Sequence, residues 1–297
     1  MTYHLRRKET VKAGIVRIAG SQISTAIEEI DDTELDRHEV VHQIRKRCKK
    51  LRGLIRLIRP AFPEYRKENV FFRDAAAELS EIRDAQSIID SFDTLIKYNE
   101  NKAAVPFEAV RRNLVERRRE IAENTSSLEA GLKNFRSRMV QARERIMTWK
   151  ITEEGFDAVA DGFMKTYKRG RKAFTKAYEV PSAENFHEWR KRVKYHWYHC
   201  RLLRQIWPEM LKVHRQTADC LADLLGDDHD LAVLKEILKR DSRHLVTSEK
   251  LDHIFTLIDE RRLELQFQAK FPGERLYAEK KKHLSKRFGS YWMSWRR

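Results

Sequence analysis

The chain contains few residues that interrupt regular secondary structure. Its 297 residues include 10 glycines and 6 prolines, fewer than the roughly 7% and 5% that are typical of globular proteins. Lys, Glu, Arg, Leu and Ala, which favour helices, are abundant. The composition therefore predicts long helices, and no alternation typical of strands persists along the sequence.

Cysteines and long apolar runs are also scarce. Cys48, Cys200 and Cys220 are odd in number and lack the spacing of metal ligands, which is typical of a reducing compartment. Each occupies an apolar helical position, so we expect three buried thiols. No run of about 18 apolar residues is present, and residues 1–8 lack the apolar core of a signal peptide. We therefore expect a cytoplasmic protein that does not use a membrane.

Several catalytic signatures are missing from the sequence. It contains no nucleophile elbow, no glycine-rich loop that would cradle a phosphate and no paired-carboxylate site. We therefore expect a binding protein rather than an enzyme, with no cofactor and no resident metal.

Basic residues are in large excess. Lys and Arg total 61 against 45 Asp and Glu, which gives a formal charge of +16. Such a surplus favours an anionic partner. Nucleic acid, an acidic membrane surface and polyphosphate all meet that description, so the charge alone does not choose among them.

The spacing of apolar residues and the positions of capping and helix-breaking residues predict an all-α chain. The Asp31–Thr33 cluster is expected to cap the second helix, and Pro60 and Pro63 to end it. Pro106 suits the first turn of a helix, and Pro272-Gly273 is expected to open the last one. The expected helices cover residues 11–30, 33–59, 66–98, 106–149 with a break at 124–127, 153–177, 183–206, 209–240, 248–268 and 274–295.

An ungapped internal repeat is the most informative feature. The segment His42–Arg59 matches the segment His187–Arg204. The identical pairs are His42/His187, Arg45/Arg190, Lys46/Lys191, Arg47/Arg192, Lys49/Lys194, Arg56/Arg201, Leu57/Leu202 and Arg59/Arg204. The match predicts a single domain made of two pseudo-repeats, at about 1–150 and 151–297.

The repeated residues form one face of a helix. At about 100° per residue, the first segment collects its basic residues on one side, with Lys46 at the margin: His42, Arg45, Lys49, Arg52 and Arg56. The second segment does the same with His187, Arg190, Lys194 and Arg201. A solvated charged face is the alternative interpretation. However, identity is concentrated on the basic face, and no acidic residue occurs between His42 and Arg59. Because crowded like charges cost stability unless an anion neutralises them, the pattern favours an anion site.

A second echo follows each basic segment. Leu79–Asp84 parallels Leu225–Asp230, so that Arg83 or His229 precedes an aspartate. Asp84 and Asp230 are expected to orient the neighbouring basic side chains. Ordinary ion pairing between helices would explain the echo equally well.

Taken together, these motifs resemble those of the CHAD family, the conserved histidine alpha-helical domain. The resemblance covers nearly the whole chain. It implies two four-helix bundles related by a pseudo-twofold axis, with a central basic groove or pore that binds inorganic polyphosphate. The residues expected to bind it are His42, Arg45, Lys46, Lys49, Arg52, Arg56, Arg83, His187, Arg190, Lys191, Lys194, Arg201, Arg204, His229 and Lys282.

The expected chemistry agrees with this resemblance. A polyphosphate receptor needs bidentate Arg forks and mobile Lys charges at regular spacing. His42 and His187 are expected to strengthen binding as the pH falls, and Lys282 to close one mouth of the groove. Arg52 is matched by Trp197 and Gly53 by Tyr198, so the two halves are not equivalent.

Two rival functions stay open. A helical metal-dependent phosphohydrolase is suggested by Asp227, Asp228, His229 and Asp230. A general nucleic-acid or polyanion binder is suggested by the charge and by four aromatic residues that could stack on bases, namely Trp189, Tyr195, Trp197 and Tyr198. Weak, salt-sensitive nucleic-acid binding is expected in any case. If the protein binds polyphosphate, proteins of polyphosphate granules are expected as partners.

Overall fold

The computed structural model describes residues 3–99, 107–123, 125–241 and 248–297. This part of the chain contains eleven α-helices, one 3-10 turn and no strand, which confirms the all-α class. No helix within it combines the length and the apolar character needed to cross a bilayer.

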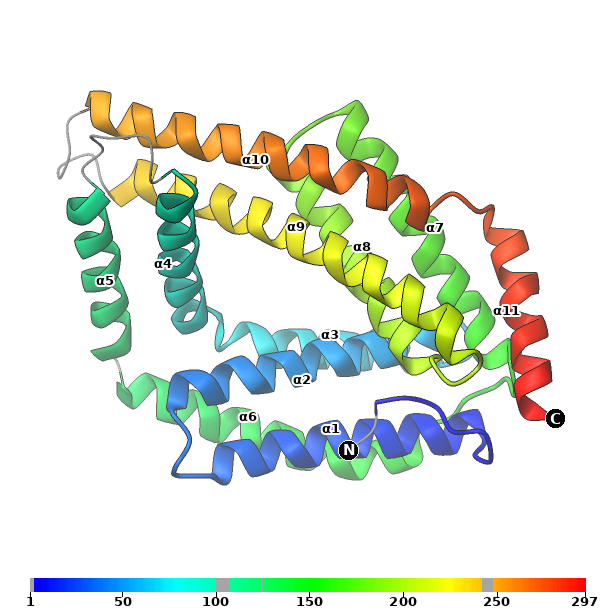
Figure 1. The fold of residues 1–297 in the computed structure, drawn as a ribbon. Helices are drawn as coiled ribbons and strands as arrows, with labels where there is room; N and C mark the ends of the chain where they lie inside the picture. The colour runs from blue at the N-terminus through cyan, green and yellow to red at the C-terminus, as the bar shows by residue number, and fades with distance from the viewer. Residues whose placement is uncertain (1–2, 100–106, 124, 242–247) are drawn as a thin grey trace.

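Figure 1 shows long helices arranged around an open frame, with α1 and α10 at opposite edges and α4 and α5 at one end. The helices are α1 Val11–Asp31, α2 Arg37–Leu57, α3 Tyr65–Ala77, α4 Ser80–Tyr98, α5 Phe107–Glu123, α6 Thr125–Arg145, α7 Asp157–Glu179, α8 Ala183–Leu202, α9 Pro208–Asp241, α10 Ser248–Leu276 and α11 Lys281–Arg296, with the 3-10 turn at Ile146–Thr148.

Polar caps set the start of the helices that matter for the site. The Asp36 carboxylate accepts hydrogen bonds from the backbone N–H groups of His38 and Glu39. It thereby satisfies donors that have no partner within the first turn of α2. The Ser182 hydroxyl oxygen caps α8 in the same way by accepting from Asn185 N. The predicted cap at Asp31–Thr33 is wrong, because α1 continues to Asp31 and the chain turns before Asp36.

The single helix predicted over 66–98 is two helices, and burial explains the break. α3 ends at Ala77 and α4 starts at Ser80. Phe72 and Leu79 are buried in one apolar cluster, whereas Ile88 and Phe92 are buried in another. Figure 1 shows that α4 turns steeply away from α3, which lets one stretch of chain serve both clusters.

The prediction that Pro272-Gly273 opens the last helix is also wrong. Pro272 lies inside α10, which continues to Leu276, and the last helix starts at Lys281. Gly273 lies so close to Trp189 that a Cβ atom there would be 2.7 Å from the indole. Packing of α10 on this tryptophan therefore outweighs the hydrogen bond that a proline removes.

The apolar interior consists of two clusters. The larger takes residues from α1, α2, α3 and α6 and from α7, α8 and α11, together with parts of α9 and α10. The smaller joins α4 and α5 to the later part of α9 and the middle of α10. Both clusters combine residues from both halves of the sequence, and α9 contributes to each. The position of α2 relative to α8 is therefore fixed by buried contacts on both halves.

A close approach between α7 and α2 gives a test of this packing. Gly162 of α7 faces the C-terminal end of α2, where a Cβ atom would overlap the Leu57 carbonyl. We expect Gly162→Ala to lower the free energy of unfolding by on the order of 3 kcal/mol, as measured by urea denaturation. Gly20→Ala is the control, because its nearest neighbour would be Ile146 Cδ1 at 3.4 Å. There the better helix propensity of alanine should leave stability unchanged or raise it, and equal losses in both variants would contradict the packing argument.

Candidate functional site

The two repeated basic segments lie on α2 and α8. These helices contact each other at a pair of residues that occupy the same position in the repeat. A Cβ atom at Gly53 would lie 2.9 Å from Tyr198 Cβ, and these two residues occupy the same position in the repeat. His199 Nε2 lies 3.2 Å from the Gly53 carbonyl oxygen. The absence of a side chain at residue 53 therefore permits the close crossing that brings the two basic segments together.

Contacts on the two sides of this crossing are related in the same way. The Arg56 guanidinium lies 4.2 Å from the centroid of the Tyr195 ring. Lys50 and Arg201 occupy the equivalent positions, and Arg201 contributes to the electrostatic field at Lys50. Exchanged contacts of this kind are what a twofold relation between the segments requires. The division of the whole chain into two repeats stays a prediction.

The first side of the crossing holds a shielded group of arginines. Arg56 is only 8% exposed and donates to the Tyr65 hydroxyl at 2.7 Å and to Asn69 Oδ1 at 2.9 Å. Arg52 Nε donates to the same amide oxygen at 3.3 Å. Arg56 therefore does not fit the alternative interpretation of a solvated charged face, because α3 covers this part of α2 and holds its guanidinium in place.

Three further arginines lie here that were not among the predicted site residues. Arg59 is also 8% exposed, and burial together with Arg169 and Arg56 lowers its pKa to about 10. Burial, Arg169 and Arg56 likewise lower the pKa of Arg192 to about 10. Arg59 and Arg192 are both identical in the repeat, a signal that could have selected them, whereas Arg169 lies on α7 and carries no such signal.

The second side of the crossing is centred on Lys50. Burial, together with Arg47, Arg201 and Lys46, lowers the pKa of Lys50 to about 8, and Glu29 offsets only part of this shift. Arg201 lies 4.7 Å from the Trp197 ring centroid. Burial, Arg215 and Arg201 also lower the pKa of Arg204. The predicted residues Lys46, Arg201 and Arg204 are thus brought together.

Near the start of α8, His187 lies against His229 of α9. The His187 and His229 rings have centroids 3.8 Å apart and line a cavity between α8, α9 and α10 together with Lys235, Arg240 and Arg262. Burial lowers the pKa of both imidazoles to about 4, and nearby cations such as Lys191 and Arg190 add to the shift. His187 is therefore neutral at neutral pH, so the expectation that it strengthens anion binding as pH falls applies only near pH 4.

We call these groups together the basic seam. Lys191 links the histidine pair to the arginine group, because it acts on both histidines and is itself influenced by Arg52 and Arg169. The seam comprises His187, Arg190, Lys191 and His229 at one end, Arg52, Arg56, Arg59, Arg169 and Arg192 beside the crossing, and Lys46, Lys50, Arg201 and Arg204 beyond it.

The other predicted residues are placed differently. Along α2, His42 is half-buried, Lys49 is exposed and Arg45 donates to the Leu79 carbonyl at 3.2 Å. Lys194 lies 3.7 Å from the Asp223 carboxylate on α9. Lys282 is exposed in the first turn of α11, a helix that packs on α7. The side chains of Arg83 and Asp84 lie outside the described residues.

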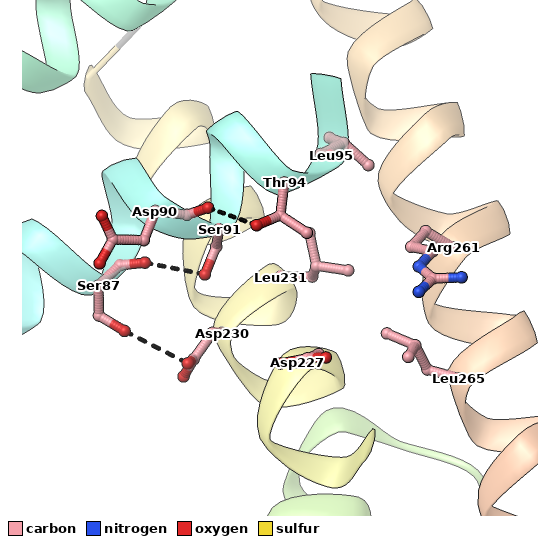
Figure 2. A pocket seen from close by; sticks show the side chains of 10 residues that line it. All are labelled: Ser87, Asp90, Ser91, Thr94, Leu95, Asp227, Asp230, Leu231, Arg261 and Leu265. Atoms are coloured by element: carbon pink, nitrogen blue, oxygen red, sulfur yellow. Dashed lines mark hydrogen bonds between the residues drawn. The ribbon is translucent and has the colours of Figure 1, made fainter. Parts of the chain in front are cut away.

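The acidic run on α9 does not converge on one point. Asp228 is buried and accepts from Arg262 Nε at 3.0 Å and from Gln266 Nε2 at 2.8 Å. Asp230 accepts from the Ser87 hydroxyl at 3.3 Å, and Figure 2 shows Asp227 and Asp230 in a separate pocket between α4, α9 and α10. Among the described residues no three His, Cys, Asp or Glu side chains are grouped to hold a metal ion.

The cysteines and aromatic residues have mostly the expected surroundings. Cys48 and Cys200 are buried, but Cys220 is exposed, because it falls on the outer side of α9 rather than on its packed face. Trp189 and Tyr198 are buried. Their rings are therefore part of the interior and are not available to stack on bases.

The comparison with protein families agrees with these features. The model of the CHAD domain matches residues 17–239, a range that includes both basic segments and the His229-Asp230 echo. The chain therefore belongs to the CHAD domain family. No curated protein matches the chain.

The depressed pKa of Lys50 predicts a pH effect on stability. The pKa of this ammonium falls from an ordinary value of 10.5 to about 8 on folding. Between these values the unfolded chain binds more protons, so Lys50 makes stability rise with pH across that window. We expect Lys50→Met to flatten this rise and to stabilise the protein at pH 7 by about 1 kcal/mol, a figure that allows for solvent screening.

Chemical denaturation at pH 7, 8, 9 and 10 measures this effect. Lys12→Met, at an exposed position of α1, is the matched control and should leave the slope unchanged. A slope that is the same in wild type and Lys50→Met would show that Lys50 is not held in an unfavourable environment.

Proposed function

We propose that this protein binds inorganic polyphosphate along the basic seam. The observation that carries the proposal is the crossing of α2 and α8 at Gly53 and Tyr198, with cations gathered on both of its sides. Their pKa values are lowered by burial and by one another. A dense polyanion would relieve this repulsion, because it supplies negative charge along the whole line.

The side-chain chemistry of the seam favours phosphate over bases. Arginines provide paired N–H donors that suit phosphate oxygens, and helical spacing of three or four residues places basic groups about 5 Å apart. Tyr195 and Trp197 lie against the cations of Arg56 and Arg201, while Trp189 is buried. A ligand that consists of phosphates alone therefore matches the seam better than one that must be read through its bases.

We also propose that the protein binds this ligand without hydrolysing it. Asp228, the buried carboxylate of the acidic run, is already held by Arg262 and Gln266, and His229 lies against His187. A metal-dependent phosphohydrolase would need these groups to face one ion. Binding alone would place the protein on polyphosphate granules, where proteins of those granules become its neighbours.

Removing adjacent cations of the seam should weaken binding. Arg52 and Lys191 come from different helices and lie close enough to influence each other, so both can contact one stretch of ligand. We expect Arg52→Gln with Lys191→Gln to weaken long-chain polyphosphate binding at least tenfold, a loss of about 1.4 kcal/mol or more, and to reduce the salt dependence of binding. Isothermal titration calorimetry at about 150 mM salt measures both quantities.

The control variant carries the same charge change elsewhere. Arg112→Gln with Arg118→Gln alters two exposed residues of α5, and we expect less than a twofold change. Duplex DNA and RNA of matched charge serve as competing ligands, and free phosphate is assayed in parallel. Equal affinity for all three polyanions would reduce the seam to a general anionic-ligand surface, and release of phosphate would contradict binding without hydrolysis.

Ligand binding should also change the protonation of Lys50. A polyanion beside this ammonium raises its pKa from about 8, so the complex takes up protons near pH 8. We expect the binding enthalpy at pH 8 to differ between phosphate-free buffers of different ionisation enthalpy, by an amount that corresponds to part of one proton. In Lys50→Met this uptake should largely disappear, and an uptake that persists there would assign the proton to another group.

A further inference from the structure

The outward face of α10 carries an apolar stripe that the fold does not use. Leu263, Phe267 and Phe271 are spaced four residues apart and are 67%, 80% and 57% exposed. Because residues four apart lie on the same side of a helix, the three side chains form a row about 12 Å long. We call this row the outer stripe.

The opposite face of α10 already supplies the packing that holds the helix in place. Ile254, Ile258, Leu265 and Ala269 are buried, and α10 packs against α9. Figure 1 shows α10 along one edge of the molecule, with α9 beneath it. The outer stripe therefore contributes little to the stability of the single chain, and exposed rows of large apolar side chains are typical of interaction sites.

The charge of α10 indicates what kind of surface can approach it. This helix contains six acidic and five basic residues, whereas the whole chain has a surplus of 16 positive charges. Two copies of so basic a protein repel each other over most of their surfaces. Along α10 this repulsion is small, so the stripe lies where a second copy can come close.

The stripe is also complementary to itself. In an antiparallel pair of α10 helices with Phe267 on the twofold axis, Leu263 lies opposite Phe271 of the second copy. The same register places Lys270 opposite Glu264, which also pairs with Arg261 of its own chain, and Arg275 opposite Asp259, which also pairs with Lys235. Glu260 opposite Glu274 is a like-charged pair in this arrangement. Apolar contacts at the centre and opposite charges beside them are the features of an isologous interface.

We propose that two copies of this chain associate through the outer stripes of their α10 helices. The stripe offers on the order of 400 Å² of apolar surface per copy, about half of the roughly 800 Å² that each partner buries in a standard interface. The dimer is therefore weak and reversible, with a dissociation constant on the order of 10 to 100 µM. The proposal does not depend on polyphosphate binding, because the three stripe residues are not part of the basic seam, although Arg262 of the same helix lines the cavity around His187 and His229.

Sedimentation velocity between about 1 and 200 µM tests the proposal, with polyphosphate absent. The wild-type mass should rise from 35.5 kDa towards twice that value. Phe267→Glu should weaken the dimer at least tenfold, whereas Val213→Glu, which adds the same charge at an exposed position of α9, should leave it unchanged. Circular dichroism verifies that both variants fold, and both should bind polyphosphate as wild type does.

The proposed register makes a further demand. Glu274→Lys converts the like-charged pair with Glu260 into an opposite-charged pair, so we expect this variant to dimerise about three- to tenfold more tightly. Wild type that stays monomeric at 200 µM would overturn the proposal. So would equal dimerisation of Phe267→Glu and Val213→Glu, and a Glu274→Lys dimer no tighter than wild type would overturn the antiparallel register.

Discussion

The close crossing of α2 and α8 is the contact on which the basic seam depends. Gly53 lets the two backbones approach, and Tyr198 fills the space on the other helix. At this point the two copies of the repeated segment meet at equivalent positions. The basic residues that precede the crossing on one helix therefore lie near those that follow it on the other helix. A larger side chain at residue 53 would push the helices apart and separate cations that a single ligand is proposed to bridge.

The crossing has an electrostatic cost that the rest of the fold must offset. Lys50, Arg59 and Arg192 have lowered pKa values because they are partly removed from water beside other cations. The larger apolar cluster, to which both α2 and α8 contribute, supplies the compensating stability. Neutral hydrogen-bond acceptors also contribute, since Tyr65 and Asn69 hold Arg56 without cancelling its charge. Arg56 is therefore ordered while it keeps its positive charge, which favours capture of a polyanion, whereas Lys191 and Arg192 both pair with the Glu188 carboxylate.

The two sides of the crossing are related but differ in character. Arg56 is shielded by α3 and bonded to two polar side chains, whereas its counterpart Arg201 lies against the aromatic rings of Trp197 and Tyr3. This difference is visible in the sequence, because the position of Arg52 in the first segment is occupied by Trp197 in the second. A polyphosphate chain lying along the seam would thus meet a more enclosed group of arginines on one side and a more open, aromatic-backed one on the other.

The sequence by itself determined the helical class, the repeat and the polarity of α2 and α8, because periodicity and residue identity are local properties. Buried Ile44, Leu51 and Trp189 opposite the basic residues follow from that pattern. Only the tertiary structure decided which basic side chains lie close to one another. Arg169 joins the seam from α7, Lys194 lies beside Asp223, and α4 breaks from α3 to reach a second apolar cluster. These outcomes depend on contacts between residues far apart in the chain, where burial of apolar surface outweighs local preference, so no spacing within one helix could reveal them.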